Sequence, residues 1–385
     1  MRQVLIPLAL AALGPTLTAC DDFSAPARAA HGPAARAPAV PPPVRVQSAG
    51  AEATPPTAAV VPVAAPAPAP DSGGVPSAAP QAKLIEASGL GAASGARAGQ
   101  PLLIKLEVLL DRAHFSPGAI DGQAGSNLRN ATAAYEKSKG LPAVTSPNAP
   151  LLEALESADP GPVTQDYAIT AEDEKGPFLG VIPQGFQALA KLDHLGYATP
   201  LEALAEKFHM SEALLRSLNP KADFAVAGTS IVVVRPAASG LGGPVAKVEV
   251  DKAAGQVRAL GADGAVLAAF PATVGSTERP APSGQWAVKT VVHDPDYSYD
   301  PRRLTFGDKS QGLLRIAPGP NNPVGSTWIA LTKETYGIHG APDPTKVGKT
   351  ASHGCVRLTN WDAATLGKAL TKGTPVVFLG QTSKS

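Results

Sequence analysis

The C-terminal third of the sequence, from about residue 245 to 379, predicts a mostly β domain, and a small helical module and a small α+β module are expected before it. Segments such as VAKVEVDKAAGQVRAL, QWAVKTVV, WIALT and TPVVFLG combine β-branched residues with Gly and Asp turns, which is typical of strands. Only NWDAATLGKAL indicates a helix there, with Asn360 as its expected N-cap. At about 135 residues, this domain is large enough to have its own core.

The helical module is expected over residues 100–158. PLLIKLEVLLDRAHF has leucines at helical spacing, SPGAIDG contains two turn signals, and NLRNATAAYEKSKGL predicts a second helix that ends at Gly140. This order of helix, loop and helix resembles the peptidoglycan-binding domain family of three-helix modules. A generic helical spacer is the alternative.

The α+β module is expected over residues 165–236. A strand at YAIT, two short helices in LEALAEKFHMSEALLRSLNP and a strand at IVVV predict the order strand, helix, helix, strand, and Thr199 begins a capping box. The order resembles a LysM module, a glycan-binding fold, but with a long insertion before the first helix. A scaffold without glycan affinity is an equal alternative.

The N-terminal segment, residues 1–19, reads as a signal peptide. After a short basic start, VLIPLALAALGPTL is apolar but too short to span a bilayer stably. Leu17-Thr18-Ala19-Cys20 resembles the lipobox of bacterial lipoproteins, in which the cysteine is acylated; an ordinary signal peptide cut nearby is the alternative. Lipidation of Cys20 implies a periplasmic, membrane-anchored protein, and Asp21 favours the inner membrane.

Residues 20–98 are expected to be a disordered linker, because Pro and Ala dominate and no periodicity for a core is present. Such a segment favours polyproline II and would tether the folded modules to the membrane. The formal net charge of +1 gives no electrostatic case for nucleic-acid binding.

The sequence contains only two cysteines, so Cys355 has no intramolecular partner if Cys20 is lipidated. It is therefore either buried and inert or retained for its chemistry. His353 lies two residues before it, and His339 lies on a strand-like stretch that a hairpin-like return could bring alongside. A neighbouring imidazolium lowers the pKa of a thiol, and Gly354 allows backbone amides to converge as an oxyanion hole.

The stretch HGAPDPTKVGKTASHGCVRL resembles the signature of the L,D-transpeptidases, whose catalytic domain is of the YkuD type. The resemblance extends over 245–379 and implies a β-sandwich with a short helix. It implies Cys355 as nucleophile, His339 as general base in a thiolate–imidazolium pair, and Gly340 as the carbonyl that orients the imidazole. Further implied are oxyanion or substrate roles, assigned to His353, Gly354, Cys355, Ser352, Arg357 and Tyr336, with Trp328 a weaker candidate.

The implied reaction is acyl transfer through a thioester, without a cofactor or metal. Cys355 attacks the bond between residue three and the terminal D-Ala of a peptidoglycan tetrapeptide stem, and an amine then accepts the acyl group, either on another stem or on a protein. Carbapenems are expected to acylate the thiol. Glycan strands are possible further partners. The alternatives are a carboxypeptidase or hydrolase on the same fold, a non-catalytic wall-binding lipoprotein, and a zinc site formed by His339, His353 and Cys355, with His293 as a further candidate.

Overall fold

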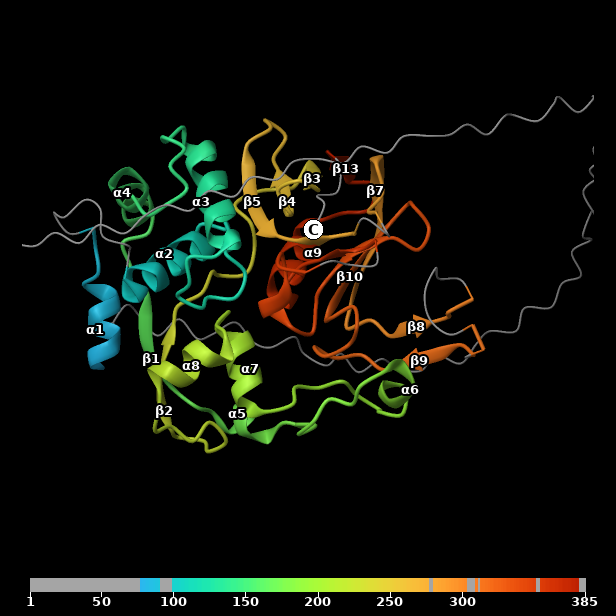
Figure 1. Ribbon diagram of the computed structural model, residues 1–385, viewed down its shortest axis with the longest axis horizontal. Helices are drawn as coiled ribbons and strands as arrows, with labels where there is room; N and C mark the ends of the chain where they lie inside the picture. The colour runs from blue at the N-terminus through green and yellow to red at the C-terminus, as the bar shows by residue number, and fades with distance from the viewer. Residues whose placement is uncertain are drawn as a thin grey trace, which may run out of the picture. The chain divides into compact units, whose positions relative to one another are not determined.

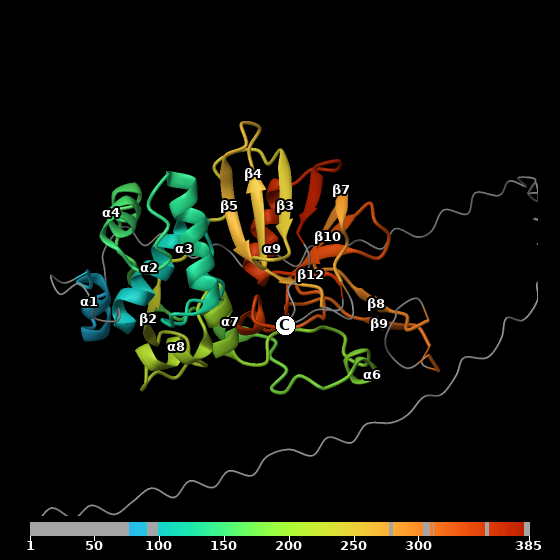
Figure 2. The same ribbon diagram turned by 45° about the horizontal axis from the view of Figure 1, so that its top comes forward.

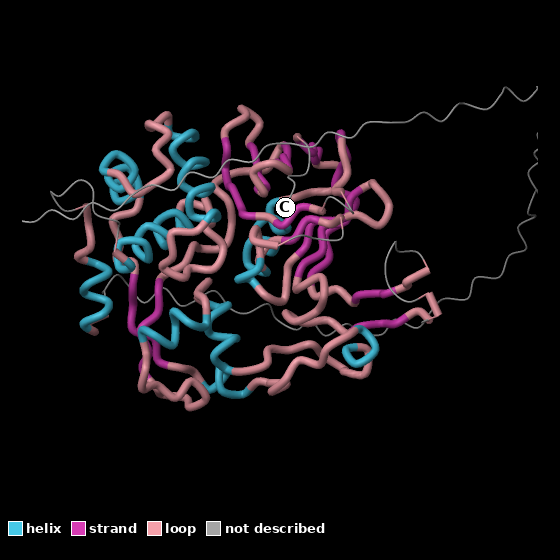
Figure 3. The backbone as a smooth tube through the Cα atoms, in the orientation of Figure 1, coloured by secondary structure: helices cyan, strands magenta, loops and turns pink. Residues whose placement is uncertain are grey.

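Helices gather in the N-terminal half of the described chain and strands in the C-terminal half (Figures 1 and 3). The computed structural model describes residues 77–90, 99–276, 280–302, 309, 310, 312–350 and 354–380, all within the unit Val63–Ser385. The predicted signal peptide, Cys20 and the linker up to residue 76 lie outside the described residues. Within the described ranges, none of the helices has the length and apolar character needed to cross a bilayer.

The helices of the described chain are α1 (Pro80–Glu86), α2 (Gln100–Arg112), α3 (Ser126–Lys139), α4 (Ala149–Ala158), α5 (Ala171–Lys175), α6 (Phe186–Leu189), α7 (Pro200–Lys207), α8 (Glu212–Leu218) and α9 (Asn360–Ala369), with a 3-10 turn η1 at Pro344–Lys346. Helices α2 and α3 are the two that the sequence predicts for the helical module. Helix α3 ends where expected, because Gly140 adopts the left-handed conformation, with φ of 66°, that glycine favours at a helix C-terminus.

Helix α1 lies inside the segment predicted to be a disordered linker, so that prediction is wrong for residues 80–86. Ala82 and Ile85 are buried in the core of the helical half. The carboxylate of Glu86 accepts hydrogen bonds from the backbone amides of Val163 and Thr164, at 3.0 and 2.8 Å. Two apolar side chains and one carboxylate therefore fix a short helix whose surrounding composition is that of a linker.

The predicted order strand, helix, helix, strand is present in the second module. Strand β1 (Thr164–Ala168) pairs antiparallel with β2 (Ser230–Val234), and α7 and α8 lie between them in sequence. Thr199 and Ser211 cap the two helices by accepting hydrogen bonds from the amides of Glu202 and Leu214. The insertion before α7 contains α5 and α6.

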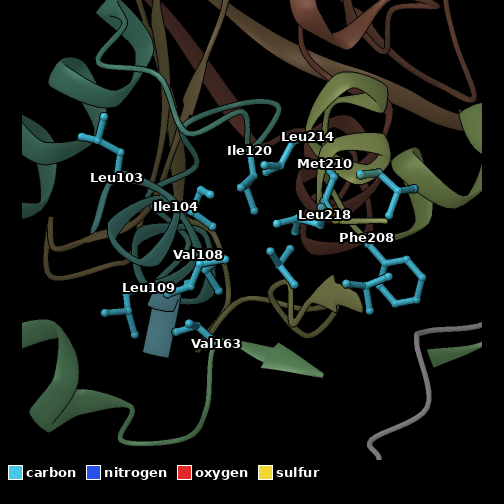
Figure 4. Close-up of a cluster of buried hydrophobic side chains, with 14 of the residues drawn as sticks. Leu103, Ile104, Val108, Leu109, Ile120, Val163, Phe208, Met210, Leu214 and Leu218 are labelled. Carbon is cyan, nitrogen blue, oxygen red and sulfur yellow. The ribbon is translucent and has the colours of Figure 1, made fainter. Parts of the chain in front are cut away.

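The two predicted modules share one hydrophobic core. Figure 4 shows side chains of α2 and of the following loop, such as Val108 and Ile120, in the same cluster as Phe208, Met210 and Leu214 of the second module. The backbones are joined as well, because the Ile120 amide donates to the His209 carbonyl at 2.8 Å. The described part of both modules is therefore packed as one body.

The strands of the C-terminal half form one nine-stranded sheet, in the order β5-β4-β3-β13-β7-β10-β11-β12-β6. They are β3 (Lys247–Asp251), β4 (Gln256–Leu260), β5 (Val266–Pro271), β6 (Thr273–Val274), β7 (Gly284–His293), β10 (Thr327–Leu331), β11 (Gly337–His339), β12 (Val356–Arg357) and β13 (Pro375–Leu379). The remaining strands, β8 (Tyr297–Tyr299) and β9 (Leu314–Ile316), form a separate antiparallel pair.

This sheet is a nearly closed barrel, which corrects the expected β-sandwich. The strands at its two edges, β5 and β6, follow each other in sequence with only Ala272 between them, so the sheet must curve back towards itself. Strand β7 is long enough to pair with β13 along its first half and with β10 along its second half. The two layers of the expected sandwich are therefore parts of one continuous sheet. Figure 2 shows β3, β4 and β5 side by side in it.

The single long helix predicted for the β domain is α9, which packs against β10. Its N-cap is Thr359, whose side chain accepts a hydrogen bond from the amide of Asp362 at 3.1 Å, and Asn360 is the first helical residue. The prediction of Asn360 as the N-cap is therefore wrong by one residue. The Asn360 side chain is left available for contacts outside the helix.

A buried polar network joins α9 to the helical half. The His209 imidazole lies 3.0 Å from the Asp111 carboxylate and stacks on the Trp361 ring with centroids 4.8 Å apart. The hydroxyl of Ser116 donates to Asp362 at 3.0 Å. Burial raises the pKa of Asp362 to about 7, and the nearby carboxylate of Asp111 adds to the shift.

Replacing Asp362 by Asn should make the stability of the protein less dependent on pH between about 4 and 7. The folded state keeps a proton on Asp362 that the unfolded state releases near its ordinary pKa of about 3.9, so stability falls as the pH rises through this window. One proton contributes at most about 1.4 kcal/mol per pH unit. Thermal unfolding at several pH values measures the effect, with Glu153→Gln on the exposed face of α4 as the control. If stability changed with pH in the same way in the wild type and in Asp362→Asn, the prediction would be wrong.

Candidate active site

His339 and Cys355 lie on neighbouring strands of the barrel. His339 is the last residue of β11, and Cys355 directly precedes β12, with Ile338 opposite Val356 and His339 opposite Arg357. The two strands run parallel, so the expected hairpin-like return is wrong, although the expected proximity of the segments is confirmed. The connection between them contains η1 and is long enough for the crossover that parallel strands need.

The His339 imidazole is buried and held by the backbone. Its Nδ1 lies 2.7 Å from the carbonyl oxygen of Gly340, which is the contact predicted from the sequence. The Trp328 ring stacks on the imidazole with centroids 5.4 Å apart. Trp328 thus supports His339 directly, a role that the sequence did not suggest for it.

Burial lowers the pKa of His339 to about 4, and the positive charge of Arg357 lowers it further, while the carbonyls of Gly340 and Val324 act in the opposite direction. The imidazole is therefore neutral at pH 7. With Nδ1–H donated to Gly340, the other ring nitrogen, Nε2, is available to accept a proton.

The Cys355 thiol is half-buried. Its Sγ lies 3.9 Å from the carbonyl oxygen of Thr335. Burial raises its pKa, while the backbone amide of Gly337 and the charge of Arg357 lower it. The raised pKa of Cys355 and the lowered pKa of His339 favour a neutral thiol and a neutral imidazole in the unliganded protein, rather than the expected thiolate–imidazolium pair. Proton transfer from Cys355 would then accompany attack on the substrate.

Arg357 provides the positive charge of this site. It occupies the β12 position paired with His339, so the two side chains lie on the same face of the sheet. Burial lowers the pKa of its guanidinium, and the Cys355 and Tyr297 side chains oppose that shift as potential anions. A cation at this position suits an anionic oxygen that forms or binds near the thiol.

Gly354 has φ of 111°, a conformation that favours glycine. A Cβ at this position would lie 3.4 Å from the Tyr336 ring, so the predicted residue Tyr336 borders the cysteine loop. The other two predicted residues of the loop, Ser352 and His353, lie outside the described residues. The predicted oxyanion hole is thus described only for Gly354 and Cys355.

Asn360 braces the backbone on which His339 depends. Its Oδ1 accepts a hydrogen bond from the Ser326 amide at 3.1 Å, and its Nδ2 donates to the carbonyl of Pro320 at 3.1 Å. A Cβ at Gly340 would lie 2.1 Å from the same Oδ1, so only glycine fits there.

The same Nδ2 of Asn360 donates to Glu206 of α7 at 3.0 Å, which connects the second module to this brace. Burial raises the pKa of Glu206 to about 7. No local pattern indicates that Asn360 and Glu206 belong to the site, because the contact between them joins segments more than 150 residues apart.

Tyr297 of β8 is a further residue that sequence reasoning missed. Burial raises the pKa of its phenol to about 12, and the Cys355 thiolate that would form nearby raises it further, whereas Arg357 lowers it. Tyr297 therefore remains a neutral hydrogen-bond donor on the side of the thiol. Its segment, HDPDYSYD, contains no motif or periodicity that would have indicated this position.

A thiol with a neutral imidazole on the adjacent strand, oriented by a main-chain carbonyl, is the arrangement of a cysteine nucleophile and its general base. Residues 246–378 match the family model described as the YkuD L,D-transpeptidase catalytic domain. These residues are an L,D-transpeptidase catalytic domain, as the sequence predicts, and they contain both His339 and Cys355.

Bacterial proteins that carry the L,D-transpeptidase name are similar to this chain. YkuD of Bacillus licheniformis is 39% identical over 64 residues, which cover 17% of this chain and 39% of that protein. YkuD of Bacillus subtilis is 28% identical over 182 residues, covering 46% and 92%. ErfK/SrfK of Escherichia coli is 27% identical over 190 residues, covering 48% and 61%. Among solved structures, L,D-transpeptidase 3 of Mycobacterium tuberculosis has a TM-score of 0.30 and 18% identity, covering 40% of this chain and 75% of that one.

Acylation of Cys355 should persist to a lower pH than an ordinary histidine would allow. Because the pKa of His339 is lowered to about 4, the imidazole is neutral and can accept a proton above that pH, and the rate should fall only as the pH drops through about 4. The rate of thioester formation with imipenem, followed by mass spectrometry between about pH 3.5 and 7.5, tests this. His339→Gln should lose most of the acylation rate, and what remains should no longer fall as the pH drops through about 4. A wild-type rate that falls around pH 6.5 instead would contradict the prediction.

Asn360→Ala should destabilise the protein by about 1–3 kcal/mol, because the Ser326 amide and the Pro320 carbonyl lose their hydrogen bonds to the Asn360 side chain. It should also slow acylation by imipenem, because the backbone at Gly340 that orients His339 loses its support. Denaturant unfolding and acylation rates measure the two effects. Asn130→Ala, which removes only a hydrogen bond to the Ala254 carbonyl, is the matched control. An unchanged acylation rate in Asn360→Ala would show that the brace does not act on His339.

Proposed function

We propose that the protein is a peptidoglycan L,D-transpeptidase of the cell envelope that forms a thioester on Cys355. The observation that carries the proposal is the arrangement of β11 and β12. These parallel strands are neighbours, with His339 at the end of β11 and Cys355 directly before β12, and Nδ1 of His339 lies 2.7 Å from the Gly340 carbonyl oxygen. The match of residues 246–378 to the catalytic domain supports it.

In the first step, Nε2 of His339 takes the thiol proton as Sγ attacks the carbonyl carbon of residue three in a tetrapeptide stem. Amides of the cysteine loop, including those of Gly354 and Cys355 and, as predicted, His353, would stabilise the oxyanion. The C–N bond to D-Ala then breaks, and the proton on His339 passes to the leaving amine. The product of this step is an acyl-enzyme thioester and free D-Ala.

In the second step, an acceptor amine attacks the thioester. Nε2 takes its proton, the S–C bond breaks, and the proton returns to Sγ as the new amide forms. With the side-chain amine of another stem the product is a 3→3 cross-link, and with a lysine of a protein it is an attachment to the wall. With water in place of the amine, the same site would be a carboxypeptidase.

The roles of the modules and the anchor are proposed from the sequence alone. Lipidation at Cys20 would attach the chain to a membrane, with Asp21 favouring the inner one. The helical module and the strand, helix, helix, strand module would bind the glycan or hold the catalytic domain near it. The alternative zinc site requires His353, which lies outside the described residues; within those residues no three His, Cys, Asp or Glu side chains converge as ligands. The zinc alternative predicts that chelators abolish the activity, whereas the thiol mechanism needs no metal.

The purified full chain, incubated with disaccharide-tetrapeptides, should yield a dimer that lacks one D-Ala. Mass spectrometry detects this product. Cys355→Ala should lower the rate at least about a thousandfold, because no thioester can form. Cys20→Ser is the matched control, since it removes the other cysteine of the sequence and should keep the activity. Tripeptide monomers alone would indicate a carboxypeptidase, and equal turnover by wild type and Cys355→Ala would overturn the proposal.

A further inference from the structure

The loop between α2 and α3 faces the catalytic half of the chain, residues 246–378. Figures 1 and 2 both show α3 beside β5, the edge strand of the barrel. In the loop, the Ser116 amide donates to the Ala269 carbonyl of β5 at 2.8 Å, and residues 115–120 are all buried. The turn residues that make this module resemble a peptidoglycan-binding domain therefore lie in a contact between the two halves.

Asn127, in the first turn of α3, contacts the segment that connects His339 to Cys355. Its Nδ2 donates to the Val347 carbonyl at 2.9 Å, and both residues are buried. Gly348 lies directly against the same side chain, because a Cβ there would overlap its Oδ1, and φ of Gly348 is 73°. Only glycine combines the small size and the backbone conformation that this position requires.

The next residue of this segment is held from the same loop. Nζ of Lys349 lies 3.5 Å from the carboxylate of Asp121, and both side chains are partly exposed. The backbone at Asp121 is itself fixed, because the amides of Asp121 and Gly122 donate to the buried carboxylate of Glu107 at 3.1 and 2.8 Å. Solvent weakens an exposed ion pair, so the buried hydrogen bond of Asn127 is the stronger restraint.

The other side of the segment is bound to the barrel strand that pairs with the cysteine strand. The Gly348 amide donates to the Thr273 hydroxyl of β6 at 2.9 Å. Thr273 is paired with Arg357 of β12, the strand that begins directly after Cys355. Residues 347–349 are therefore held between the helical module and β6, the strand next to that of the thiol.

We propose that the helical module is a positioning element of the active site: Asn127 and Gly348 fix residues 347–349, and this fixed point determines how the chain approaches Cys355. Asn127 is the positioning residue, because it acts on the nucleophile through the segment and does not touch the substrate. The inference rests on the proposed function only in taking Cys355 as the nucleophile. The family domain, residues 246–378, does not contain Asn127 and lacks this support by itself.

The first test is the rate at which imipenem acylates Cys355 in the full chain, measured by mass spectrometry. Asn127→Ala should lower the maximal acylation rate about tenfold and leave the half-saturating concentration of imipenem unchanged, because the thiol is misplaced while the binding residues remain. Asn130→Ala is the matched control and should keep the wild-type rate. It lies one turn further along α3 and loses a hydrogen bond to a different backbone carbonyl of the catalytic half, that of Ala254.

Gly348→Ala changes the same contact from its other side. The added methyl group would overlap the side chain of Asn127, so this variant should also slow acylation. In the double variant with Asn127→Ala the overlap is removed, and the combined loss of rate should be smaller than the product of the two single losses. Losses that simply multiply would overturn the proposal, because the two residues would then act independently.

Hydrogen exchange at individual amides of the full chain tests the placement without a substrate. The Gly348 amide is protected by its hydrogen bond to β6, and the Leu358 amide donates to the His339 carbonyl at 2.8 Å, so it reports the pairing of the cysteine and histidine strands. Asn127→Ala should speed exchange at both amides about tenfold, because the segment opens more often. Asn130→Ala should leave both amides unchanged.

Wild-type exchange at both amides in folded Asn127→Ala, or an equal increase in Asn130→Ala, would overturn the proposal. If Asn127→Ala does not fold, Gly348→Ala is measured in its place, with the same expected results and the same contradicting ones. Exchange needs neither a stem peptide nor imipenem. Absence of stem turnover with the expected exchange would therefore overturn the proposed function alone.

Discussion

The active centre depends on the hydrogen bonds of the Asn360 side-chain amide. One residue at the start of α9 satisfies the Ser326 amide, the Pro320 carbonyl and the Glu206 carboxyl, and it leaves room only for glycine at position 340. The carbonyl of that glycine then fixes the imidazole of His339. Because buried polar groups are costly when left without partners, the four segments that meet at Asn360 are held in a single arrangement.

The residues proposed to react could be named from the sequence because they lie in one short stretch. Cys355, Gly354 and His339 fall within 17 consecutive residues. A cysteine, a glycine and a histidine at this spacing indicate a thiol nucleophile with a general base. Helices α2 and α3 were predictable for a similar reason, since apolar spacing and Gly140 are local signals. The Gly340 contact with His339 was also expected and is present.

What escaped prediction depends on contacts between distant parts of the chain. Helix α1 has the composition of a linker and is ordered only by its contacts with the core and with β1. The sheet curves towards a barrel because its two edge strands, β5 and β6, are adjacent in sequence, a relation that no local pattern reveals. Glu206 and Tyr297 have no motif, because their positions follow from contacts between the second module and the catalytic half.

The second module packs on the β8–β9 pair, so the part of the chain that folds together differs from the part that matches the catalytic family. The segment that matches the catalytic family begins at residue 246, and this boundary records shared ancestry. Tyr299, Ile316 and Asn360 instead find their partners in residues 176–206, so the unit that folds around the thiol is larger than the unit that is inherited.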